Sequence, residues 1–236
     1  ARSTSGAACV AIDPGQDPDR SGHNYYDNYG PYDLTSYAVF GEAYWQMSEN
    51  FKFTLGLRYT VDKKEVENHS VTLGTPGSGI GAPAPGQPAI LKAKFSEPTG
   101  RFGFDWKPDL GFTNDTLIYG FYSRGYKAGG VNPAFSPGIG VVAISPIFKP
   151  EFIDSLEIGS KNTLADGTLQ VNVAAFHYDY KGYQVSKIIN RTSINENIDA
   201  KVMGAEFESI WQPLDGLRLN AAIGWLDSKI GKASSI

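Results

Sequence analysis

The feature that most constrains this chain is the alternation of apolar and polar residues with a period of two. In Phe51–Val61, "FKFTLGLRYTV", the odd positions are apolar or aromatic and the even positions are polar or small. Leu217–Trp225, "LRLNAAIGW", repeats the pattern, and Leu169–Tyr178 begins in the same way. Because successive side chains of a β-strand point to opposite faces, this period predicts strands with one apolar face. We find no convincing amphipathic helix between them.

Eight strands are predicted, and most exceed the five or six residues that are usual in globular sheets. The expected ranges are 36–47, 51–66, 92–106, 116–127, 151–162, 168–188, 198–212 and 217–230. A strand that crosses a membrane needs about 9–11 residues. The fold class that we predict is therefore all-β and antiparallel, with lengths that suit a transmembrane β-barrel.

The connections alternate between short and long. The short ones include "TLADGT" and "QPLDGL", in which Asp-Gly favours a hairpin turn because Gly adopts positive φ without a steric penalty. Long connections rich in Gly and Pro are expected at 67–91 and 128–149, and residues 1–34 are expected to form another external loop. A further loop is expected at 190–197. Outer-membrane barrels show this asymmetry, with short periplasmic turns and longer external loops.

Composition excludes several function classes. The formal net charge of -4 provides no basic field that would gather nucleic acid, and Cys9 is the only cysteine, so neither an internal disulfide nor a thiolate zinc site is expected. The three histidines, His23, His69 and His177, have no neighbours at metal-ligand spacing. "GSGIG" at 77–81 lacks the Lys-Ser/Thr and the helix of a phosphate loop. No catalytic constellation stands out, so we do not expect an enzyme.

Tryptophan positions fit a membrane with two interfaces. Trp45, Trp106 and Trp211 each fall at a predicted strand end beside a short turn, which places them at one rim. Trp225 lies eight residues along its strand, toward the opposite interface. Indole prefers the membrane interface, where its ring is in the apolar zone and its N–H is within reach of water.

Four segments resemble the barrel of TonB-dependent outer-membrane receptors, the active-uptake channels of Gram-negative bacteria. They are "SYAVFGEAYWQMSENFKFTLGLRYTVDKK" (36–64), "LIYGFYSRGYKAGGVNP" (117–133), "FKPEFIDSLEIGSKNTLADGTLQVNVAAFHYDYKGYQV" (148–185) and "GAEFESIWQPLDGLRLNAAIGWLDSKI" (204–230). Together they cover about half of the chain, in the order that the family has.

The resemblance implies that residues 1–236 are an internal part of a 22-stranded barrel, of which this chain supplies about eight strands. No plug-like segment and no TonB-contacting box are recognisable in the sequence. It also implies a bacterial outer-membrane location, contact with lipid, energy from the TonB–ExbB–ExbD complex through a plug domain, and no cofactor. A ferric siderophore is the cargo expected first, with oligosaccharides and vitamins as alternatives.

Charged residues are expected to face a water-filled lumen, because an Arg on the lipid face costs about 2–4 kcal/mol at mid-membrane. The residues expected to face inward are Lys52, Arg58, Glu206, Glu208 and Arg218. Those expected to touch lipid are Phe51, Leu55, Leu57, Leu219 and Ile223.

The candidate ligand contacts lie in external loops and the upper lumen. They are Tyr25, Tyr26, Tyr29, Tyr32 and Arg124. The first four belong to or adjoin "HNYYDNYGPY", whose rings can stack on a flat ligand and donate hydrogen bonds, or simply pack the loop. Arg124 shares a strand face with Tyr122 and Tyr126, and we expect it to point to the lumen or its upper rim.

Three other interpretations are compatible with the pattern. A self-contained eight-stranded barrel with a structural or adhesive role requires the first and last strands to pair. A membrane-embedded hydrolase would need a Ser/His pair, and none stands out. A soluble β-sandwich also uses strands separated by turns.

Overall fold

The computed structural model describes residues 27–29, 31–67, 69–71, 90–132, 145–189 and 192–231. Every regular element in these ranges is a β-strand. The strands are β1 Asp27–Tyr29, β2 Tyr32–Ser48, β3 Phe51–Glu67, β4 His69–Val71, β5 Ile90–Trp106, β6 Asp115–Lys127, β7 Gly130–Val131, β8 Ile147–Phe148, β9 Glu151–Leu164, β10 Leu169–Ile189, β11 Thr192–Leu214 and β12 Leu217–Ile230. No helix in the described ranges is long and apolar enough to cross a membrane.

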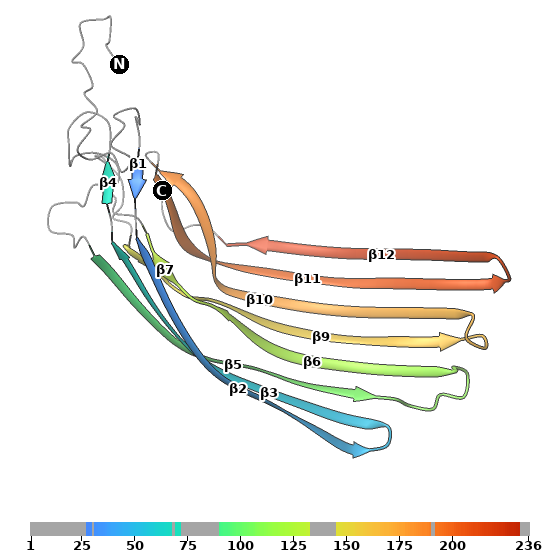
Figure 1. Ribbon diagram of the computed structural model, residues 1–236. Helices are drawn as coiled ribbons and strands as arrows, with labels where there is room; N and C mark the ends of the chain where they lie inside the picture. Colours follow the sequence, from blue (N-terminus) through green and yellow to red (C-terminus); the bar gives the residue numbers. More distant parts are fainter. Residues whose placement is uncertain are drawn as a thin grey trace, which may run out of the picture.

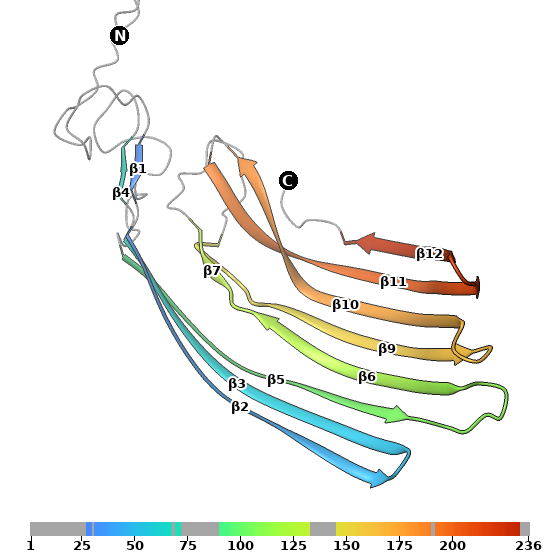
Figure 2. The ribbon, with the colours of Figure 1, turned by 45° about the vertical axis from the view of Figure 1, so that its right-hand side comes forward.

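The eight long strands form one antiparallel sheet in the order β12-β11-β10-β9-β6-β5-β3-β2. The sheet is curved, and its edge strands β2 and β12 remain apart (Figures 1 and 2). The short pair β1–β4 lies beyond one end of the sheet (Figure 1), and the short pair β7–β8 lies within that end, with β7 against β3 and β5 and β8 against β11. Because β2 and β12 do not pair within the described residues, the alternative of a closed eight-stranded barrel is wrong, and a single sheet does not match a sandwich either.

All eight predicted strands are confirmed, with ends that shift by a few residues. The loop expected at 190–197 is wrong, because β11 already begins at Thr192. Its polar residues form a regular ladder with β10, from Ile189–Thr192 to Tyr183–Ile198, and Ile194 is fully buried. Pairing with a partner strand therefore overrides the weak strand preference of "TSINEN". Strand β2 likewise begins at Tyr32, inside the range 1–34 that was expected to be a loop.

Three of the four turns at the end that we call the lower end are tight (49–50, 165–168 and 215–216), whereas the turn at 107–114 is longer. Gly167 and Gly216 adopt φ of 87° and 81°, as the Asp-Gly pattern predicts. Ala165 and Asp166 also have positive φ in the turn between β9 and β10. The strand ends that the two long connections join, of β3 and β5 and of β6 and β9, lie at the opposite, upper end.

Register shows that the charged residues predicted to share a face do so. One unbroken row of paired residues crosses the sheet through Gln46, Lys52, Asp105, Tyr119, Gly159, Ala174, Glu206 and Gly224. By alternation along their strands, Arg58, Glu208 and Arg218 lie on this same side. We call it the polar face.

The opposite, apolar face carries the large exposed side chains of the interior strands. They are Leu55, Leu57, Tyr59, Phe102, Tyr122, Leu156, Ile158, Val173 and Met203. The residues predicted to touch lipid, Leu55, Leu57, Leu219 and Ile223 among them, are on this side. A sheet with one charged and one aliphatic face is the pattern of a barrel wall between water and lipid.

The apolar run is staggered from strand to strand. On β2 it extends from Trp45 up to Tyr37, and on β12 from Leu217 up to Trp225. One row of paired residues joins Trp225 to Trp45 across the sheet. Trp225 is the upper end of the apolar run on β12, whereas Trp45 is the lower end of the apolar run on β2. The run therefore climbs across the sheet, as it does when strands tilt relative to a membrane. Trp45 and Trp225 lie at opposite borders, as predicted.

Candidate functional site

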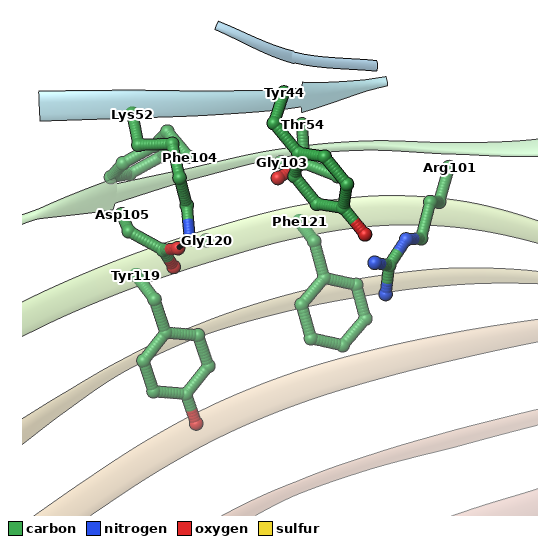
Figure 3. A pocket seen from close by; sticks show the side chains of 10 residues that line it. All are labelled: Tyr44, Lys52, Thr54, Arg101, Gly103, Phe104, Asp105, Tyr119, Gly120 and Phe121. Carbon is green, nitrogen blue, oxygen red and sulfur yellow. Dashed lines mark ion pairs between the residues drawn. The ribbon is translucent and has the colours of Figure 1, made fainter. Parts of the chain in front are cut away.

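A hollow on the lower part of the polar face has a volume of about 190 Å³. Its walls come from β2, β3, β5 and β6, and the side chains of Tyr44, Lys52, Arg101 and Tyr119 project into it (Figure 3). Gly103 has little room for a side chain, because a Cβ there would lie 3.0 Å from the Gly120 carbonyl oxygen and from Phe121 Cβ. This hollow is a shallow part of the wall rather than an enclosed pocket.

Charges in the lower hollow are paired between strands: Lys52 pairs with the neighbouring strand β5, and Arg101 of β5 reaches over β3 to β2. Lys52 Nζ lies 2.6 Å from Asp105 Oδ2, and Arg101 Nη2 lies 2.5 Å from Glu42 Oε1. Tyr44 donates its hydroxyl proton to the other oxygen of Glu42. Lateral pairs of this kind keep charged side chains upright on a wet surface, and they contribute little to stability because both partners are solvated.

A second hollow of about 280 Å³ lies on the upper part of the polar face. Arg58, Asp62 and Lys64 of β3 line it, together with Tyr126 at the end of β6. The Tyr126 hydroxyl donates to Asp62 Oδ2 at 2.9 Å, and Lys64 Nζ donates to the carbonyl oxygen of Gly129 at 2.5 Å. Burial lowers the pKa of Lys64, which lies beyond the apolar run of its strand. The upper hollow thus combines two cations, a carboxylate and a phenol.

The upper hollow forms where the sheet divides. Pairing between β5 and β6 stops at Gly100–Arg124, whereas β3 and β5 stay paired up to Glu67–Ile90. The chain after β6 crosses toward β3, and the β7–β8 pair contacts both β5 and β11. A Cβ at Gly129 would overlap the Phe148 carbonyl oxygen, and one at Gly130 would overlap the Phe148 ring. The double glycine therefore allows the close approach of the β7–β8 pair.

Asn132 fixes the base of this connection. It is 2% exposed, its side-chain nitrogen donates to the carbonyl oxygens of Ser145 and Asn195, and its side-chain oxygen accepts from the Asn195 N–H. Asn197 similarly bonds to both the N–H and the carbonyl oxygen of Lys149. Segments far apart in the sequence are thus joined at the upper rim by fully used amide groups. The sequence did not single out these asparagines, because an isolated Asn in a polar stretch carries no signal of its partners.

The predicted ligand-contact tyrosines fall only partly within the described structure. Tyr25 and Tyr26 lie outside the described residues, and Tyr29 is placed only as the end of β1, opposite His69. Tyr32 begins β2 at the upper end and is 51% exposed. Burial, followed by the nearby charge of Asp62, raises the pKa of Tyr32. Tyr32 lies two residues above Leu34, a lining residue of the upper hollow, on the same side of β2.

Arg124 faces the side opposite to the one expected. Its row of paired residues runs through Leu57, Gly100 and Asp154, so by register it lies on the apolar face and not toward the lumen. Tyr126, two residues farther on, reaches Asp62 of the polar face because β6 has by then parted from β5. The strand "LIYGFYSRGYK" has aromatic residues on both faces, so alternation alone cannot assign them, and a shift of one residue inverts the assignment.

Arg124 is neutralised on that face. Its Nη1 donates to both carboxylate oxygens of Asp154 at 3.0 Å, and the Tyr122 hydroxyl donates to the same carboxylate at 2.6 Å. The guanidinium also lies 4.7 Å from the centre of the Phe152 ring. These contacts sit at the upper border of the apolar run, where an arginine can keep its charge.

No group of three or more His, Cys, Asp or Glu side chains that could hold a metal ion occurs in the part of the chain that the structure describes. Both hollows are open and lined by wall residues. Their arrangement suits contact with a bound molecule or a second domain, and it provides no nucleophile with an adjacent base.

Comparisons with known proteins agree on one family. The chain is 24% identical to the pesticin receptor of Yersinia pestis and Yersinia enterocolitica over 176 residues, 74% of this chain and 23% of that receptor. Its fold resembles the ferric yersiniabactin uptake receptor FyuA of Yersinia pestis (TM-score 0.66, 21% identity, 89% of this chain and 29% of that one). It also resembles the copper transporter OprC (TM-score 0.59, 16% identity, 83% and 29%).

The chain thus spans less than a third of the length of these relatives. The sequence profile described as "TonB dependent receptor-like, beta-barrel" matches residues 6–235, nearly the whole chain. An open eight-stranded sheet with one polar and one apolar face is what part of such a barrel looks like. The chain belongs to the β-barrel domain of the TonB-dependent receptors, which are outer-membrane proteins of Gram-negative bacteria.

Proposed function

We propose that the receptor containing this chain takes up a ferric siderophore, with energy from the TonB–ExbB–ExbD complex acting through a plug domain. In this barrel the polar face is the lumen wall and the upper end is the external side. The protein is a transporter on this proposal, and the chain itself performs no chemistry on its cargo.

The observation that carries the proposal is the composition of the upper hollow. Arg58 and Lys64 provide two cations beside the phenol of Tyr126, on the part of the wall that an incoming ligand meets first. Ferric chelates are commonly anionic and often carry aromatic rings, so cations and phenols suit them. The similarity in fold to FyuA, a ferric yersiniabactin uptake receptor, supports this class of cargo.

Tyr25, Tyr26, Tyr29 and Tyr32 are the external contacts that we propose for the cargo. Tyr32 lies two residues from Leu34, which lines the upper hollow, on the same side of β2. Arg124, on the opposite face, is not part of this surface.

The experiment is uptake of iron-55 delivered as a panel of siderophores by iron-starved cells that carry or lack the gene. We expect uptake of at least one siderophore to require the gene and to fall severalfold in Arg58→Gln/Lys64→Gln. The matched control is Lys107→Gln, which removes an exposed cation from the lower turn. If deletion leaves uptake of every siderophore unchanged while uptake of an oligosaccharide or a vitamin is lost, the cargo assignment is wrong.

A further inference from the structure

Two lysines face each other at the upper border of the apolar face. Lys63 of β3 is paired directly with Lys94 of β5 in the sheet register, and both side chains are exposed. On β3 the odd positions carry the apolar run from Phe51 to Val61. Lys63 is thus the first position on this face above the run, and Lys94 is its neighbour.

No carboxylate in the described part of the chain balances the two charges. Like charges directly opposite in an antiparallel pair destabilise the sheet. The third residue of the row is the uncharged Thr35, and within the described ranges no carboxylate forms a hydrogen bond or ion pair with either lysine. The next row up shows the contrast, because there Lys92 and Glu65 form an ion pair of 3.0 Å.

The two nearest carboxylates on β2 and β3 form no ion pair with these lysines. Asp62 lies on the other face, where it accepts the Tyr126 hydrogen bond. Asp33 shares the face with the lysines but is paired with Glu65 in the register. Within the described residues the Lys63–Lys94 pair therefore forms no ion pair, whereas Lys92 and Glu65 in the next row do.

The position of the pair relative to the membrane is fixed by aromatic residues. Tyr37 and Tyr59 lie on the same face just below it and are 63% and 48% exposed. Tyrosine concentrates at the membrane interface, with its ring in the apolar zone and its hydroxyl in water. Lysine side chains one or two residues farther along extend into the headgroup layer.

We propose that Lys63 and Lys94 together bind the phosphate of an anionic lipid in the outer leaflet. Paired side chains have Cβ atoms about 4.5–5.5 Å apart, so two flexible lysine stems can converge on one phosphate. The aliphatic wall beneath them, which includes Leu57 and Val61, receives the acyl chains of the same molecule. A lipid satisfies both features, whereas a free phosphate ion satisfies only the first.

The test uses the complete receptor in neutral detergent. Micelles are doped with phosphatidic acid, with phosphatidylcholine of the same chains, or with neither plus sodium phosphate. Lipid retained per receptor is measured by native mass spectrometry, and the melting temperature is measured in parallel. The variant is Lys63→Gln/Lys94→Gln. The control, Lys107→Gln/Lys161→Gln, removes the same charge from the lower turn and the polar face.

We expect the wild type and the control to retain phosphatidic acid in preference to phosphatidylcholine, and the variant to bind it about tenfold or more weakly, since each lysine near an anionic lipid contributes about a fivefold factor. Lys63→Arg/Lys94→Arg should retain binding. Equal retention by wild type and variant would overturn the proposal. So would a stabilisation by sodium phosphate equal to that by the lipid, which would make the pair a site for free anions.

Discussion

Placing a charge on the apolar face tests the assignment of the two faces most directly. Leu55 lies within the apolar run of β3, in the same row as Phe102 and Tyr122, and is 48% exposed. Thr54 precedes it and belongs to the polar face, opposite Tyr44. The two positions share a strand and a depth, so Leu55→Arg and Thr54→Arg differ mainly in the side of the sheet that receives the guanidinium.

The depth of Leu55 follows from strand geometry. From Phe51 to Val61 the run extends about 34 Å along the strand at about 3.4 Å per residue. With a tilt of about 40° this becomes about 26 Å along the membrane normal, close to the roughly 25 Å apolar band of outer-membrane barrels. Leu55 then lies about 10 Å above the lower border, near the middle. Arginine there should cost about 2–4 kcal/mol.

The assay is unfolding of the complete receptor in lipid vesicles with guanidinium, followed by tryptophan fluorescence. We expect Leu55→Arg to lower the free energy of unfolding by about 3 kcal/mol. Thr54→Arg should change it by less than about 1 kcal/mol, because its charge stays in water. If Thr54→Arg proved as destabilising as Leu55→Arg, or if Leu55→Arg had no effect, the faces would be wrongly assigned.

Two other substitutions test contacts at the upper end. Gly129→Ala should increase hydrogen exchange and protease cleavage in the β7–β8 pair, because the added Cβ overlaps the Phe148 carbonyl oxygen. The control, Gly41→Ala, should leave both unchanged, since no atom lies within 4 Å of its added Cβ. Equal effects of the two substitutions would contradict this role of Gly129. Arg124→Ala should lower the free energy of unfolding by about 1–3 kcal/mol, because it leaves the Asp154 carboxylate without its ion-pair partner at the lipid border. The double variant Arg124→Ala/Asp154→Ala should recover part of this loss. A double variant no more stable than the single one would argue against the pairing.

Much of the wall could be predicted because a strand with one wet and one apolar face must alternate. Phe51–Val61 and Leu217–Trp225 each show this period without interruption. Their local residues alone therefore predict that they are strands, which side chains lie on the apolar face, and the tight turns beside them. The family could be recognised from the same stretches together with "SRGYKAGG".

The candidate site was harder to predict, since its residues come together only through pairing between distant strands. The upper hollow joins Asp62 to Tyr126 and Lys64 to Gly129, pairs separated by more than 60 residues, and no local pattern links them. The base of the connection after β6 is likewise held by Asn132 and Asn197, whose partners lie on other segments.

Local sequence was enough to establish the strand class, the long strands, the lower turns and the side occupied by Lys52 or Leu55, because alternation and turn chemistry act within a few residues. The extension of β11 to Thr192, the outward position of Arg124 and the opposition of Lys63 to Lys94 became known only from the folded sheet. Each of these depends on the register between strands. A shift of one residue in register exchanges the two faces and every cross-strand partner. The sequence of a single strand does not specify how it is aligned with its neighbours.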